Sequence, residues 1–126
     1  MRVIFETPDK MYRITEHPDL DYDLDNLKGD CFNPEVCPDI PNLKAKELAF
    51  EALVEREGVF GYQLERWDAT PGRGYETIDS CWGFVGMYTD SSDSHYIVDE
   101  MKNTIETLIA DKTISRMVSY NERDSE

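Results

Sequence analysis

Basic residues are scarce in this 126-residue chain. It carries 13 Lys plus Arg against 27 Asp plus Glu, for a formal net charge of −14. Proteins that bind nucleic acids or anionic membrane surfaces use lysine and arginine to neutralise phosphates. The composition therefore argues against direct contact with either. It favours a basic protein partner, bound cations or simple solubility.

Long apolar runs and cysteines are also few. No run approaches the roughly 18 apolar residues of a membrane-spanning helix, and the N-terminus has no apolar stretch typical of a secretory signal. Cys31, Cys37 and Cys81 give an odd number of thiols, which fits a reduced protein. We therefore expect a soluble cytoplasmic protein. Its length and 40% apolar content predict one domain, residues 1–126, that folds without disulfide or metal.

Motifs for nucleotide binding, zinc hydrolysis and serine hydrolysis are missing. The string DSCWGF at 79–84 resembles the surroundings of the nucleophilic cysteine in papain-like proteases. That family needs a His and an Asn more than about 100 residues downstream, and too few residues follow Cys81. A half-buried strand cysteine is the better interpretation. A polar pocket near Asp79, Cys81 and His95, serving a small-molecule binder or small enzyme, remains the alternative.

Metal sites receive little support from residue spacing. Cys31 and Cys37 are separated by five residues, a wider gap than the usual zinc knuckle, and no second close pair exists. An EF-hand calcium loop needs a glycine at its sixth position and a glutamate at its twelfth. A loop that starts at Asp19 or at Asp21 has neither residue at these positions. We therefore predict no metal and no cofactor.

Residues 16–41 differ from the rest of the chain. They contain eight acids, four prolines and only one base, Lys28, which predicts a surface loop. Within it, Asp19, Asp21, Asp23 and Asp25 alternate with apolar residues. An extended segment would place these carboxylates in one row, about 6.6 Å apart, with the apolar residues holding the other side to the protein body. A solvated loop without a specific role is the alternative.

Hydrophobic periodicity predicts helices over 42–57 and 95–111. A hairpin is predicted from strands 59–68 and 75–85, and further strands over 2–6, 11–15 and 114–120, with a frayed tail at 121–126. The predicted fold is α+β, with two helices packed on a small antiparallel sheet built around one central hairpin. The helices would cover a sheet face formed by Phe60, Tyr62, Leu64, Ile78, Trp82 and Phe84.

Three segments together resemble a group of small, uncharacterised acidic proteins of bacteriophages and plasmids. These are EHPDLDYDLDNLKGDCFNPEVCPDIP, GVFGYQLERWD and DSCWGFVG. The resemblance covers roughly residues 12–100 and implies a bacterial host cell as the setting, without assigning an activity or site residues. Small acidic proteins of such elements often inhibit host defence, for example by occupying the DNA groove of restriction or CRISPR nucleases.

The leading hypothesis is a non-enzymatic, DNA-mimicking binding protein that engages a basic, nucleic-acid-binding protein surface. It would bind neither nucleic acid nor membrane itself. A homodimer that buries Trp67 and Trp82 is a third possibility. The predicted contact residues are the acidic-loop aspartates, two aromatic anchors and a secondary helical set: Asp19, Asp21, Asp23, Asp25 and Asp30; Trp67 and Tyr88; and Glu47, Glu51 and Glu55.

Overall fold

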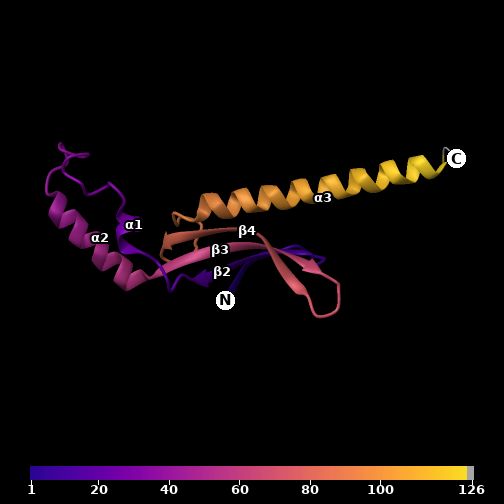
Figure 1. The fold of residues 1–126 in the computed structure, drawn as a ribbon, viewed down its shortest axis with the longest axis horizontal. Helices are drawn as coiled ribbons and strands as arrows, with labels where there is room; N and C mark the ends of the chain where they lie inside the picture. Colours follow the sequence, from indigo (N-terminus) through magenta and orange to yellow (C-terminus); the bar gives the residue numbers. More distant parts are fainter. Residues whose placement is uncertain (125–126) are drawn as a thin grey trace.

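The structure, a computed structural model, describes the backbone of residues 1–124 and the side chains of residues 1–111. Four antiparallel strands lie in sheet order β1-β2-β3-β4, so each strand pairs with its neighbour in sequence. They are β1 (Arg2–Glu6), β2 (Tyr12–Pro18), β3 (Val59–Asp68) and β4 (Gly74–Val85). The helices are α1 (Leu24–Lys28), α2 (Leu43–Glu57) and α3 (His95–Asp124). The predicted α+β class is confirmed (Figure 1).

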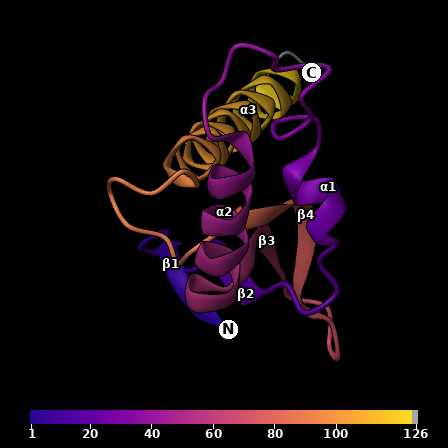
Figure 2. The same cartoon turned by 90° about the vertical axis from the view of Figure 1, so that its left-hand side faces the viewer.

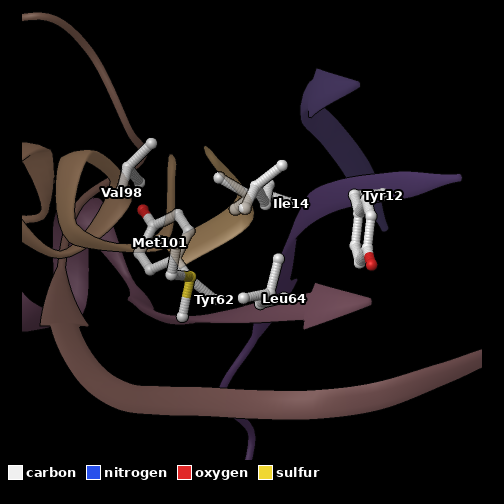
Figure 3. Close-up of a cluster of buried hydrophobic side chains, with 7 residues drawn as sticks. Tyr12, Ile14, Tyr62, Leu64, Val98 and Met101 are labelled. Carbon is white, nitrogen blue, oxygen red and sulfur yellow. The ribbon is translucent and has the colours of Figure 1, made fainter. Parts of the chain in front are cut away.

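The core lies between α3 and one face of the sheet (Figure 3). Alternate residues of β2 and β3 point to the same side of the sheet, because successive strand residues face opposite ways. Val98, Met101 and Ile105 lie one helical turn apart on α3 and meet them. The fully buried sheet residues of this core include Ile14, Tyr62 and Leu64.

Two β-bulges change which residues of β4 face the core. Phe60 pairs with Phe84 but Gly61 pairs with Trp82, so Gly83 is the extra residue, and its φ of +92° favours glycine. Trp82 consequently lies over Gly61 on the face turned away from α3. The prediction that Trp82 shares the helix-covered face with Phe84 is therefore wrong, because it assumed unbroken alternation.

Helix α2 lies at the end of the strands, where it contacts β4, and α1 lies beside it (Figures 1 and 2). Asn42 precedes α2 and Gly58 ends it, as predicted, although the Asn42 side chain makes no capping hydrogen bond. Val54 is the buried residue of α2, and Phe50 packs on Phe32 with ring centroids 5.5 Å apart. The helix is thus held partly by the turn-rich segment that precedes it.

The predicted boundaries require three corrections. The acidic loop begins later than residue 16, because β2 continues through Pro18 and Glu16 is buried in the core. The same loop contains the short helix α1. Helix α3 continues through residues 114–120, where a strand was predicted, and through 121–124 of the predicted tail. Residues 125–126 lie outside the described residues.

Candidate functional site

A hollow of about 470 Å³ lies between the segment after β2 and the edge strand β4. We call it the acidic hollow, because three carboxylates contribute to its lining. Its lining residues are Asp19, Asp21, Tyr22, Asp23, Asn26, Leu27, Trp82 and Gly83. It therefore combines negative charge with two aromatic side chains.

Backbone hydrogen bonds and one helix cap place the carboxylates around this hollow. The Asp19 amide donates to the Val59 carbonyl at 2.8 Å, which ties the end of β2 to the start of β3. The chain then turns, and the Asp23 carboxylate accepts from the Asp25 amide at 2.9 Å as the N-cap of α1. Leu27 of α1 lies against Gly83 of β4. Helix α1 thereby holds the carboxylates beside the edge strand.

The predicted extended row of four carboxylates does not form. The segment turns after Asp19, and Asp25 lies within α1 and outside the lining of the hollow. Leu20, predicted to hold the row against the body, is 87% exposed. Asp30 is exposed in the turn that follows α1. The structure therefore gathers the first three aspartates around a hollow instead of spacing four along a line.

None of the three hollow carboxylates is neutralised by a side chain of residues 1–111. In the part of the chain whose side chains are described, no lysine or arginine lies within ion-pair distance of Asp19, Asp21 or Asp23. Their negative charge is thus available to a ligand.

Trp82 forms an aromatic wall of the hollow and is 43% exposed. A methyl group at Gly61 would lie 2.0 Å from Cε3 of the indole, so the absence of a side chain at Gly61 lets the ring lie on the strand. The His17 ring is 6.1 Å from it, centroid to centroid. An exposed indole beside carboxylates suits a cation, because the negative face of the ring attracts positive charge.

A chain of hydrogen bonds fixes the histidine beside Trp82. The Thr15 hydroxyl donates to the Glu65 carboxylate at 2.8 Å, and Arg13 pairs with the same oxygen at 3.1 Å. Because the hydroxyl hydrogen is used there, the Thr15 oxygen accepts Nε2–H of His17 at 2.8 Å. Sequence reasoning missed this network, since Glu65 and Thr15 lie 50 residues apart.

The predicted aromatic anchors lie elsewhere. Trp67 packs edge-to-face on Tyr75 at 5.1 Å, at the other end of β3. Tyr88 follows β4, and its amide donates to the buried Glu16 carboxylate at 2.6 Å. Burial raises the pKa of the Tyr88 phenol. Tyr88 thus supports the core, whereas Trp67 remains 44% exposed.

The predicted acidic face of α2 is partly neutralised. Glu51 pairs with Lys28, and Glu47 pairs with Lys44 at 3.0 Å. The Lys44 hydrogen bond lowers the pKa of Glu47. Glu55 is exposed. The helix therefore offers less free negative charge than its sequence indicates.

The alternative pocket near Asp79, Cys81 and His95 is not formed by direct contacts. Asp79 accepts from the adjacent Ser80 amide at 2.9 Å, and His95 pairs with Asp99 at 3.1 Å. Within residues 1–111, no contact joins the three side chains, and no group of three or more His, Cys, Asp or Glu could hold a metal ion. The three cysteines are free thiols.

Comparison with known protein families, curated proteins and solved structures found no match. The resemblance to phage and plasmid proteins therefore stays a prediction. A search of the described helices found none with the length and apolar character needed to cross a membrane. Any functional assignment has to rest on the geometry of the acidic hollow.

Proposed function

We propose that this chain is a non-enzymatic binding protein that engages a basic protein surface through the acidic hollow. One observation carries the proposal: Asp19, Asp21 and Asp23 are unpaired within the described chain and lie around a hollow walled by Trp82. A lysine or arginine of the partner would supply the positive charge that the protein itself does not.

The expected energies are modest but sufficient for selectivity. An exposed ion pair contributes about 0.2–1 kcal/mol, and a cation over an exposed aromatic ring about 0.5–1 kcal/mol. Three carboxylates and Trp82 together would then contribute about 1–4 kcal/mol, or roughly 5- to 1000-fold in affinity. The net charge of −14 adds long-range attraction that speeds encounter with a basic partner.

The partner class that charge and resemblance favour is a nucleic-acid-binding protein of bacterial host defence, of the restriction or CRISPR type, met in the host cytoplasm. Such proteins present arginines and lysines to phosphates. The hollow would accept one of these side chains. This differs from the predicted carboxylate row, which would have followed a groove over several phosphate steps.

Charge removal at the hollow tests this proposal. The variant Asp19→Asn/Asp21→Asn/Asp23→Asn removes three charges and keeps the helix cap, because asparagine caps as well as aspartate. Glu100→Gln/Glu106→Gln/Asp111→Asn removes the same charge from exposed positions of α3. Both variants and the unmodified protein are used to capture proteins from a bacterial host lysate at low and physiological salt, and retained proteins are identified by mass spectrometry.

The hollow variant is expected to lose a partner that the α3 variant retains. Binding of that partner should weaken as salt rises, because exposed charge interactions are screened. Equal capture by the two variants would contradict the proposal.

A further inference from the structure

In the described residues 1–124, one face of the sheet carries no helix. Helix α3 covers the face that holds Tyr62, while α1 and α2 lie at the end of the strands (Figure 1). The other face, which we call the open face, carries the residues that alternate with the core positions of β2 and β3. Its main side chains are Arg13, Thr15, His17, Glu65, Trp67 and Trp82.

Two exposed tryptophans mark the ends of the open face. Trp82 of β4 lies over Gly61 of β3. Trp67 follows Gly61 by six residues in β3, and residues separated by an even number point to the same side of a strand, so both indoles lie on the open face. Six strand residues span roughly 20 Å. The Trp82 ring lies against the backbone at Gly61, and the Trp67 ring packs edge-to-face on Tyr75. Rigid aromatic side chains are effective anchors, because little side-chain entropy is lost on binding.

Among the described strand residues, the one cation of the open face is already neutralised. Arg13 pairs with Glu65, and its guanidinium lies 3.6 Å from the centroid of the Tyr75 ring. No strand contains a lysine, and the other strand arginines, Arg2 and Arg66, are each paired with a glutamate. The described strand residues of the open face therefore contribute no free positive charge that would repel a basic segment.

The Trp82 end of the open face is acidic. The three hollow carboxylates lie beside Trp82, and no ion pair neutralises them among the described side chains. At the other end, Asp68 follows Trp67 and, because successive strand residues face opposite ways, points to the side of the sheet that α3 covers. A basic segment on the open face would therefore meet complementary charge at the Trp82 end.

We propose that the open face is a docking surface for an extended, arginine-bearing segment of the partner, with one arginine placed in the acidic hollow against Trp82. This rests on the proposed function and specifies the chemistry of the partner. Arginine is favoured over lysine because its planar guanidinium stacks on an indole and pairs with carboxylates through two parallel hydrogen bonds. An extended segment of about six residues would span the distance between the two tryptophans.

The two indole N–H groups make this proposal directly testable by NMR, since Trp67 and Trp82 are the only tryptophans. Their signals are assigned with Trp67→Phe and Trp82→Phe. The probes are synthetic eight-residue peptides of alternating arginine and valine, and of alternating lysine and valine. The arginine peptide is expected to shift both indole signals. It should bind several-fold more tightly than the lysine peptide, and Trp82→Leu should weaken it about three- to five-fold.

Failure of docking and failure of the proposed function give different results. If the hollow triple variant weakens peptide binding and only the Trp82 indole signal moves, the hollow is used and the open-face proposal is overturned. Equal binding of arginine and lysine peptides overturns the arginine preference. If the triple variant binds the arginine peptide as well as the unmodified protein does, both proposals fail. Sedimentation during the titration identifies indole shifts caused by self-association, which would instead make a second copy the occupant.

Discussion

Replacing Gly61 with alanine should destabilise the protein by displacing Trp82. The new Cβ would lie 2.0 Å from Cε3 of the indole, whereas carbon atoms in contact are about 3.5–4 Å apart. The ring must therefore move by at least about 1.5 Å. Trp82 is 43% exposed, so it buries roughly 100 Å² of a side chain that can bury about 200 Å². Full displacement would cost about 2.5 kcal/mol.

The strand preference for alanine over glycine offsets about 0.5–1 kcal/mol of that cost. We therefore expect a net loss of about 1.5–2 kcal/mol in the free energy of unfolding. Urea titrations followed by far-UV circular dichroism measure it, and near-UV circular dichroism reports the loss of the fixed indole environment. Peptide binding at the open face should fall as well, although no charge has been removed.

Making Gly61→Ala in a Trp82→Leu protein tests whether the clash with Trp82 causes the loss of stability. In Trp82→Leu, the smaller and flexible side chain can move away from the new methyl group, so Gly61→Ala should be neutral or slightly stabilising there. The double-mutant cycle then gives a coupling of about 1.5–3 kcal/mol. Equal destabilisation in both backgrounds would refute the reasoning and indicate a backbone requirement at position 61.

Two further predictions concern the core and α1. Burial raises the pKa of the Tyr62 phenol, and its hydrogen bond to Glu16 at 2.8 Å raises it further. A raised folded pKa gives stability that is fully present below the unfolded value of about 10 and is lost as pH rises above it. Tyr62→Phe should therefore flatten the fall in urea stability between about pH 9 and 11, while costing about 1–2 kcal/mol at neutral pH. An unchanged alkaline slope would contradict this. For α1, Asp23→Ala should increase amide hydrogen exchange in residues 24–28 by about five-fold, since a lost cap costs about 1 kcal/mol, and Asp23→Asn should not. Matching exchange in both variants would show that the cap is unimportant.

Elements with sustained periodicity could be predicted from the sequence. Met101 and Ile105 lie in a stripe that the structure buries, and the alternation of Tyr62 and Leu64 correctly placed them in the core. These predictions succeeded because helix and strand periods leave a repeated pattern over many residues. The hairpin was likewise bounded by clear turn residues.

Local irregularities and long-range pairs were not predicted. A glycine within a strand is typical of a bulge, so Gly83 indicated a break in the alternation of β4. Which face Trp82 then occupies depends on how β4 pairs with β3, and this pairing could not be predicted from the local sequence. Glu16 was counted among the loop acids, whereas it is buried and bonded to Arg2 and Tyr62. Nothing in the local sequence of Glu16 identifies partners 14 and 46 residues away.

The distribution of charge, more than its total, determines where this protein can bind. Each strand arginine is paired with a strand glutamate. The pairing offsets the cost of burying or closely packing the glutamate carboxylate. Most of the other acids lie in loops and on helices. On α2, two glutamates are again paired with lysines. The carboxylates around Trp82 differ because neither a strand arginine nor a helix lysine whose side chain is described pairs with them. A partner's cation can therefore bind there without displacing one of the ion pairs of this part of the chain.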